Sequence, residues 1–417
     1  MLLKHLAAPK PGTFDPAALR RSSPPLRVLA ARRPYRLFRL LRSLPVFRAP
    51  FLRFLMLSRF DEVREVLFRD LDFSICFDEA FGELDPEYKT FVLGLSDDEA
   101  YRSIRRPTMN AFRWTDAARV GTLAFEHAEA ALQRGHGRID AMQDLITASM
   151  RSIIERYVGV PASQEFVLWT YTLCLYDFLP WAPPHHVRDQ AAVASESVAR
   201  TLLAAIRAAR ESPAGETAVS RLVAMTKGDA TLDEAAVRAI LTGMIAGLLS
   251  GTTLAAANLL EVLLDNPRMM VAAEEAARAG DDDLLGRCLL EASRFRPLAW
   301  GLFRKTEVDT MVADGTPRAK RIRRGELILA GIWPAMLDPR GIPQPWHFDP
   351  LRPADHYLGF GHGQHWCLGS HLALAHMTQC FKPLLQRGGV RRAHGHEGRT
   401  SYFGPFAEHL TVLYHHP

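Results

Sequence analysis

The sequence predicts a mainly α-helical fold with a small β-rich region, and three observations lead to that class. Apolar residues recur at helical spacing in many segments, of which residues 59–70 are the clearest. Residues 239–260 contain no charged side chain, which favours a long buried helix. Segments that resemble strands are short and few, at residues 46–57, 308–333 and 401–415.

Composition indicates a large soluble protein that works in a reducing compartment. The chain has 417 residues, of which 48% are hydrophobic and 23% charged, which is enough for one large core or two domains. Its five cysteines are scattered, and none forms a C-x-x-C pair. A disulfide framework or a structural zinc site is therefore not expected, and we expect a cytoplasmic protein without a secretory signal.

Positive charge is concentrated at the N-terminus. Residues 1–58 hold 12 Lys or Arg and one acid, Asp15, whereas the whole chain is only +5. We expect residues 1–45 to be a basic arm rich in Pro and Arg, and residues 46–417 to be one domain. The arm could contact a membrane surface or an acidic partner, but a solvated arm that caps the fold is favoured. Nucleic-acid binding is not expected, because no nucleic-acid-binding module accompanies the charge.

The first half of the chain reads as strands followed by helices. A strand pair at 46–57 precedes the helix at 59–70, and residues 71–95 lack periodicity. Ser96 and the acids after it are typical of a helix start, with the helix ending near Phe112. Further helices are expected in five segments, namely two within 115–160, then 163–180, 185–211 and 217–227.

The second half begins with the uncharged stretch 239–260. By length alone it could cross a membrane, but its glycine and threonine content and its place among amphipathic helices favour a buried core helix. One helix follows Pro267, and Asp281 begins another. Short strands at 308–333, a helix at 371–385 and a hairpin at 401–415, with its tip near 403–407, complete the prediction.

The most informative stretch is residues 357–371. Six positions form the pattern F-G-x-G-x-H-x-C-x-G, namely Phe360, Gly361, Gly363, His365, Cys367 and Gly369. Glycines permit tight turns with positive φ that point N–H groups inward, and a helix N-terminus after the cysteine favours a thiolate. This stretch closely resembles the cysteine-ligand loop of the cytochrome P450 family. The alternative is a plain buried cysteine in a glycine-rich turn.

A second motif supports the resemblance. Glu291 and Arg294 match the family's E-x-x-R, whose spacing puts both charges on one side of a helix. The resemblance implies that Arg352 is the third member of a structural network that holds the cysteine loop. It covers roughly residues 50–415 and implies a triangular prism with haem b between the central helix and the cysteine loop.

The resemblance also implies cofactor contacts. Cys367 would be the thiolate ligand of the iron. The residues expected to bind the cofactor are Tyr101, Arg105, Arg304, Phe360, Gly361, His365 and Cys367. Tyr101 stands where the family has a histidine, so it would donate a hydrogen bond to a propionate without a charge.

The distal side departs from the family pattern. Family members carry an acid and an alcohol, (A/G)-G-x-(D/E)-T, on the central helix to deliver protons. Three registers are possible, which put Gly251, Ser250 or Leu249 at the acid position, and none supplies a carboxylate. The hydroxyls of Ser250 and Thr252 are therefore the candidate catalytic groups, acting through water.

Three functions remain open. We expect a monooxygenase that inserts one oxygen atom from O₂ into a mainly apolar small organic substrate, served by a ferredoxin-type donor that binds near Arg102 and Arg106. A peroxygenase or rearranging enzyme is the first alternative, and a non-catalytic haem-thiolate ligand-binding protein is the second. The residues expected to line the substrate pocket are Met244, Gly247, Leu248, Gly251, Ala299, Trp300 and Phe406.

Overall fold

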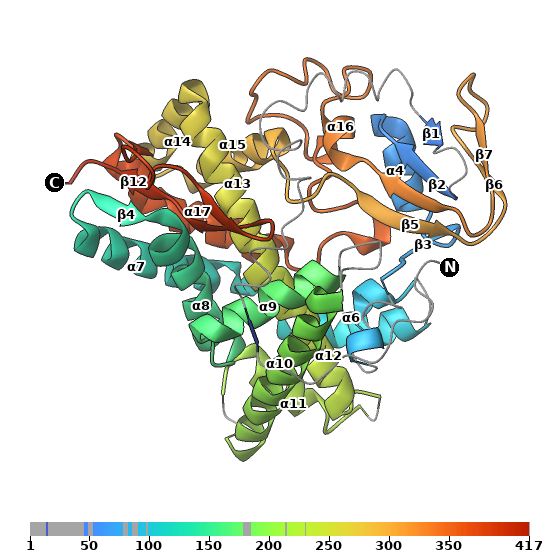
Figure 1. Cartoon of the computed structure of the whole chain (residues 1–417), viewed down its shortest axis with the longest axis horizontal. Helices are drawn as coiled ribbons and strands as arrows, with labels where there is room; N and C mark the ends of the chain where they lie inside the picture. The colour runs from blue at the N-terminus through green and yellow to red at the C-terminus, as the bar shows by residue number, and fades with distance from the viewer. Residues whose placement is uncertain are drawn as a thin grey trace.

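The computed structural model describes residues 14–15, 46–48, 53–77, 82–85, 91–96, 99–177, 185–212, 215–229 and 231–416. Apart from Phe14 and Asp15, the basic arm lies outside the described residues, and so does the Pro-rich stretch at 178–184. The chain forms a larger helical part and a smaller β-rich part, and the central helix runs through the helical part (Figure 1). The mainly α-helical class that the sequence predicts is confirmed.

The β-rich part contains a five-stranded sheet in the order β1-β2-β8-β5-β3, with β2 and β8 parallel and the other pairs antiparallel. Its strands are β1 (Val46–Arg48), β2 (Phe54–Leu57), β3 (Phe73–Ser74), β5 (Leu302–Thr306) and β8 (Leu327–Ala330). Helices α4 (Phe60–Phe68) and α16 (Ile332–Met336) share a core with the sheet, and β6 (Thr310–Val312) pairs with β7 (Lys320–Ile322). In α4 the residues at helical spacing, Val63, Val66 and Leu67, are fully buried, as their pattern predicts.

The helical part is built from long helices that bury one face each. Its α-helices are α6 (Glu99–Ala111), α7 (Ala117–Gly135), α8 (Ala148–Ile153), α9 (Gln164–Asp177), α10 (His185–Glu211), α11 (Ala218–Met225), α12 (Glu234–Ile245), α13 (Thr252–Asp265), α14 (Pro267–Ala279), α15 (Asp282–Phe295) and α17 (Ser370–Arg387). Three π-helical turns are η4 (Ala141–Thr147), η5 (Ile154–Val158) and η6 (Ala246–Gly251), and the 3₁₀ turns are η2 (Val92–Gly94), η3 (Trp114–Asp116), η7 (Ala354–His356) and η8 (Gly363–His365). Helices α7 and α17 pack along each other, which places the helix after the cysteine loop inside the fold.

The central helix is formed by α12, η6 and α13 without a break. Among the described residues it is the one helix long and apolar enough to span a membrane, over Glu234–Asp265. Its most apolar window is 78% buried inside the protein. It is therefore the core helix that the sequence predicts.

Two predicted segments differ from the structure in detail. Short strands are expected within 308–333, and β6, β7 and β8 confirm them, but β8 ends at Ala330 and α16 begins at Ile332. Pro334 explains this end, because it has no N–H to donate to a strand ladder.

The C-terminal segment, residues 401–413, contributes strands to two different sheets. Strands β10 (Ser401–Phe403) and β11 (Phe406–His409) form the predicted hairpin, but β12 (Thr411–Leu413) leaves it and pairs with β4 (Arg138–Asp140) and β9 (Arg391–Arg392). The backbone N–H of Leu410 donates to Asp140 at 3.3 Å, which anchors the chain where it changes sheets.

Candidate functional site

The loop before α17 is closed by its own backbone. The N–H of Cys367 donates to the carbonyl of Phe360 at 2.9 Å. Gly361 and Gly363 have φ values of 83° and 74°, a region that side chains disfavour. A Cβ on Gly363 would lie 2.9 Å from the carbonyl oxygen of Leu67, so the loop packs directly on the end of α4. The glycine spacing therefore sets the path that presents the cysteine.

The Cys367 side chain is both accessible and desolvated. Its side chain is accessible, yet desolvation by the surrounding protein is the main cause that raises the pKa of its thiol. The backbone N–H groups of Gly369 and Ser370 oppose that shift by donating to the sulfur. These two observations agree if the sulfur faces an internal space rather than the outer surface. A cation bound to the sulfur would favour the thiolate, because a coordinated thiol loses its proton.

The central helix lies on the other side of this space. A Cβ on Gly369 would lie 3.9 Å from Met244 Cε and 4.0 Å from Leu248 Cδ2. Gly247, one residue before Leu248, is exposed within this otherwise buried helix, and its Cβ position has no atom within 4 Å. A flat group bound between Gly369 and the central helix would displace the flexible ends of the Met244 and Leu248 side chains. Because Gly247 has no side chain, such a group would be able to lie close to the helix backbone there.

Arg304 is the basic group that burial affects most here. It is 3% exposed, its Nη1 donates to the carbonyl of Phe303 at 2.8 Å, and its buried Nε has no hydrogen-bond partner in the part of the chain that the structure describes. Desolvation lowers the pKa of Arg304 to about 10. A buried guanidinium with an unused N–H fits a carboxylate such as a haem propionate.

Of the other residues expected to bind the cofactor, some contact the cysteine loop and one is exposed on α6. The hydroxyl of Tyr101 donates to the carbonyl of Gln364 at 2.8 Å, and its ring meets the His365 ring edge-on at 4.8 Å. Tyr101 thus contacts the cysteine loop itself, an arrangement that no sequence spacing indicates. Arg105 lies one turn later on α6 and is exposed. Phe360 is half-buried against Trp366, with ring centroids 6.0 Å apart.

Glu291, Arg294 and Arg352 come together in a buried network. Arg294 donates to both carboxylate oxygens of Glu291, at 2.6 and 3.1 Å, and both side chains are fully buried. Arg294 Nη1 also donates to the carbonyls of Met336 at 2.8 Å and Pro345 at 2.5 Å. Arg352 Nε donates to Glu291 at 3.4 Å. The network thus ties α15 to α16 and to the segment that leads into the cysteine loop.

The hydroxyls of the central helix have distinct environments. Ser250 is 2% exposed, and within the described residues its buried Oγ has no hydrogen-bond partner. Thr252 is 3% exposed. Thr253 Oγ1 donates to the carbonyl of Leu249 at 2.5 Å and lies 2.9 Å from the hydroxyl of Tyr171. Of the three, Thr253 is therefore the hydroxyl that is already engaged.

The predicted wall residues are only partly brought together. Met244 and Leu248 are buried and lie opposite Gly369, as described above, whereas Ala299 is half-buried on the segment after Pro297. Phe406 is buried and stacks on Tyr171, with centroids 4.1 Å apart and planes 11° apart. Trp300 meets Trp333 edge-on at 5.8 Å.

Two contacts near the site were not expected from the sequence. Leu298 is 42% exposed and reaches within 4.0 Å of the Cβ position of Gly251, and Asn258 Nδ2 holds the adjacent carbonyl of Pro297 at 3.3 Å. Glu261, the acid directly after the uncharged stretch, pairs with Arg296 and accepts from the hydroxyl of Tyr402 at 3.2 Å. An isolated acid in an apolar helix is the signal that could have indicated such a buried pair.

Comparisons with known proteins agree with this geometry. The family model for Cytochrome P450 matches residues 53–407. Cytochrome P450-terp of Pseudomonas sp is 25% identical over 304 residues, which are 70% of this chain and 68% of that protein. Cyclomarin C epoxidase CymV of Salinispora arenicola is 29% identical over 258 residues, 61% of this chain and 62% of that protein.

Other similarities are more limited in length or in identity. A bifunctional dioxygenase–epoxy alcohol synthase of Pyricularia oryzae is 32% identical over 129 residues, 31% of this chain. The chain spans about a tenth of the length of this and a related Fusarium oxysporum protein, 11% and 10% respectively. The solved structure of P450BioI with a ligated acyl carrier protein has a TM-score of 0.78 at 20% identity, covering 92% of this chain and 98% of that chain.

The desolvated sulfur, the open glycine on the facing helix and the unused N–H of Arg304 all fit an iron porphyrin. Together with the match over residues 53–407, they show that the chain belongs to the cytochrome P450 family, whose cofactor is haem b.

Proposed function

We propose that this protein is a monooxygenase that inserts one oxygen atom from O₂ into a mainly apolar small organic molecule. The observation that carries the proposal is that Gly369, two residues after Cys367, faces Met244 and Leu248 of the central helix, beside the open Cβ position of Gly247. Haem b, when bound, would supply an iron that activates oxygen, with Cys367 as the residue that holds it. In the balanced reaction one C–H bond becomes C–OH and the second oxygen atom becomes water. O₂, two electrons and two protons are consumed.

The chain's own groups hold the cofactor and its ligand. The N–H groups of Gly369 and Ser370 stabilise the Cys367 thiolate, and the unused Nε–H of Arg304 binds a propionate carboxylate. The buried pair of Glu291 and Arg294 keeps the cysteine loop at a fixed distance from α15.

The buried hydroxyl of Ser250 is the favoured proton carrier. Its Oγ makes no hydrogen bond within the described chain, so this hydroxyl is not committed to a partner and is a candidate to pass a proton. Thr253 is a poorer carrier, because its hydroxyl is engaged with Leu249 and Tyr171. Thr252 is the second hydroxyl within the same turn and shares the role.

The substrate is expected to be mainly apolar, because Met244, Leu248, Leu298 and Phe406 supply hydrocarbon surface around the open turn. The similarity to an epoxidase of Salinispora arenicola supports oxygen transfer to an organic molecule. A ferredoxin-type donor would supply the electrons and dock by two exposed arginines of α6, Arg102 and Arg106. We place the enzyme in the cytoplasm and do not favour a membrane role for the basic arm.

A second function, rearrangement of an organic hydroperoxide or use of peroxide, is favoured by two observations. Residues 246–253 contain no carboxylate. The acid that family members use to deliver protons when the O–O bond of O₂ is cleaved is therefore missing. Two bifunctional dioxygenase–epoxy alcohol synthases match parts of the chain at 32% and 30% identity. Such a reaction needs no electron donor, because the hydroperoxide supplies both the oxygen atom and the oxidising equivalents.

The deciding experiment begins with a spectral screen of the haem-loaded protein. Fatty acids, terpenoids, aromatic compounds and peptides are tested for a ligand-induced spin shift, and a hit identifies the substrate class. The hit is then incubated under ¹⁸O₂ with reduced nicotinamide and a surrogate ferredoxin and reductase. In parallel it is incubated with hydrogen peroxide alone, and its hydroperoxide is incubated without O₂.

Incorporation of one ¹⁸O atom with nicotinamide consumption supports the monooxygenase. Product formed only in the peroxide or hydroperoxide arms would refute the monooxygenase and support the second function. Ligand binding without turnover in any arm would refute both and indicate a ligand-binding protein. The Ser250→Ala variant should lower product per nicotinamide by about 100-fold or more. The matched control is Thr242→Ala on the same helix, whose buried hydroxyl already donates to the carbonyl of Arg238 at 2.9 Å and which should leave the yield unchanged.

A further inference from the structure

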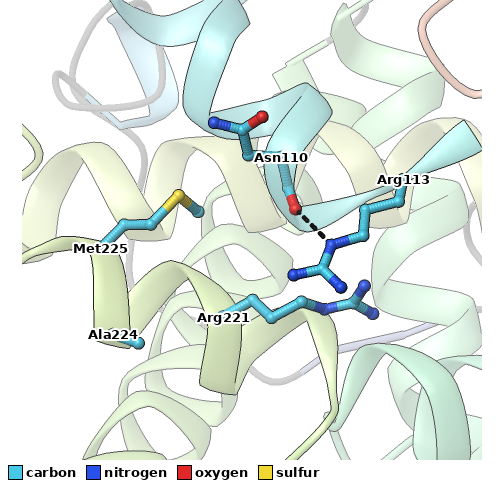
Figure 2. A pocket seen from close by; sticks show the side chains of 5 residues that line it. All are labelled: Asn110, Arg113, Arg221, Ala224 and Met225. Carbon is cyan, nitrogen blue, oxygen red and sulfur yellow. Dashed lines mark hydrogen bonds between the residues drawn. The ribbon is translucent and has the colours of Figure 1, made fainter.

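A pocket between α6 and α11 contains two arginines and has no assigned role. It has a volume of about 580 Å³ and is lined by Asn110, Arg113, Arg221, Ala224 and Met225 (Figure 2). None of these residues belongs to the Cys367 site or its supporting network. The pocket therefore needs an explanation of its own.

Arg221 is only partly neutralised. Its side chain is 12% exposed, and its Nη1 donates to Asp116 Oδ2 at 2.5 Å. The same carboxylate oxygen accepts from the hydroxyl of Tyr157 at 3.0 Å, so it is shared. Arg221 Nη2 is buried, and no hydrogen-bond partner for it lies among the described residues. Since buried guanidinium N–H groups are normally paired, this donor is available to a ligand.

Arg113 brings a second cation to the same end of the pocket. Its Nε donates to the carbonyl of Asn110 at 3.2 Å, the contact drawn as a dashed line in Figure 2. Within the described residues its Nη groups make no hydrogen bond, so capping the end of α6 uses only one edge of the guanidinium. In Figure 2 the guanidinium groups of Arg113 and Arg221 lie near each other. With Asp116 as the neighbouring carboxylate, one positive charge remains uncompensated.

We infer that this pocket binds a phosphoryl group, either as inorganic phosphate or as the phosphate ester of a small organic molecule. Its two guanidinium donors come from different segments and converge from different directions, which suits a tetrahedral oxyanion with several acceptor oxygens. A planar carboxylate is matched best by one guanidinium fork, and Asp116 already occupies one edge of Arg221. Ala224 and Met225 give the remainder of the pocket an apolar side for the organic part of an ester.

The test uses the haem-loaded full chain and isothermal titration calorimetry at constant ionic strength. Inorganic phosphate, glycerol phosphate and acetate are titrated separately into the wild type. Saturable binding of phosphate with weak or absent binding of acetate is expected, and tighter binding of glycerol phosphate identifies an ester as the ligand. Arg113→Gln is expected to weaken phosphate binding about tenfold or more, because it removes a charge-assisted hydrogen bond.

Arg119→Gln is the matched control. Arg119 is an exposed arginine on the adjacent α7 that donates to the backbone carbonyls of Glu216 and Arg156 and does not line the pocket. Its substitution should change the phosphate affinity by less than about twofold. Arg221→Lys keeps the pair with Asp116 but removes Nη2, and it should weaken binding as Arg113→Gln does.

Three outcomes would overturn the inference. They are the absence of saturable phosphate binding to the wild type, equal weakening in Arg113→Gln and Arg119→Gln, and acetate binding as tight as phosphate. An unchanged Soret band and circular dichroism spectrum in each variant ensures that lost binding is not lost folding.

Discussion

Replacing Arg294 by leucine tests whether the buried network supports the cysteine loop. The substitution removes two hydrogen bonds to Glu291, at 2.6 and 3.1 Å, and those to the carbonyls of Met336 and Pro345. It leaves the fully buried carboxylate of Glu291 with Arg352 Nε at 3.4 Å as its remaining arginine contact. Removing one partner of a buried ion pair costs about 3–5 kcal/mol of the free energy of unfolding. We expect a loss of that size and weaker haem retention.

The measurement is urea-induced unfolding followed by circular dichroism, with the Soret band recorded on the same samples. Arg287→Leu is the control on the same helix, because its pair with Asp283 at 2.8 Å is 49% and 79% exposed and should be worth less than about 1 kcal/mol. A single variant that loses no more than Arg287→Leu would refute the reasoning.

Three further predictions follow from the site and from one buried histidine. Gly247→Leu should abolish the spin shifts caused by bulky ligands and leave the thermal midpoint nearly unchanged, because its Cβ position is open. Gly363→Ala should leave the spin shifts in place and lower the free energy of unfolding by about 1–3 kcal/mol, because its φ is 74°. Two variants with the same effects in both assays would contradict this assignment. Tyr101→Phe removes the hydrogen bond to the Gln364 carbonyl and should lower the free energy of unfolding by about 1 kcal/mol in urea titrations. An unchanged free energy of unfolding would argue against that contact. Burial lowers the pKa of His376 from 6.5 to about 3, so the unfolded chain takes up a proton first and stability falls as pH drops from 6.5 towards 3. His376→Gln should flatten this acid dependence, worth about 3 kcal/mol between pH 7 and pH 4, in unfolding measured at these two pH values, and an identical pH dependence would exclude His376 as its source.

Local spacing predicted much of the site. The positive φ values of Gly361 and Gly363 follow from the glycine pattern of the loop, and the contact between Glu291 and Arg294 follows from their separation on one helix. Arg352 lies 61 residues after Glu291, and only the family resemblance indicated that it joins them.

Contacts between distant segments were out of reach of the sequence. The hydroxyl of Tyr101 meets the carbonyl of Gln364, 263 residues away, and a backbone carbonyl carries no sequence signal. The stack of Tyr171 on Phe406 depends on how α9 packs against the C-terminal hairpin, which helical periodicity does not specify. The wide turn at 246–251 also lacks a sequence signal, because its residues fit an ordinary α-helix equally well.

That wide turn gives the central helix an unusual freedom to vary in length. Each residue in an α-helix advances the chain by about 100°, and a π-helical turn corresponds to one extra residue accommodated without breaking the helix. Deleting one residue from 246–251 would convert the turn to regular α-helix and keep residues 252–265 in phase with their packing partners. A single deletion would therefore reshape the surface beside the cofactor while the rest of the core stays in register.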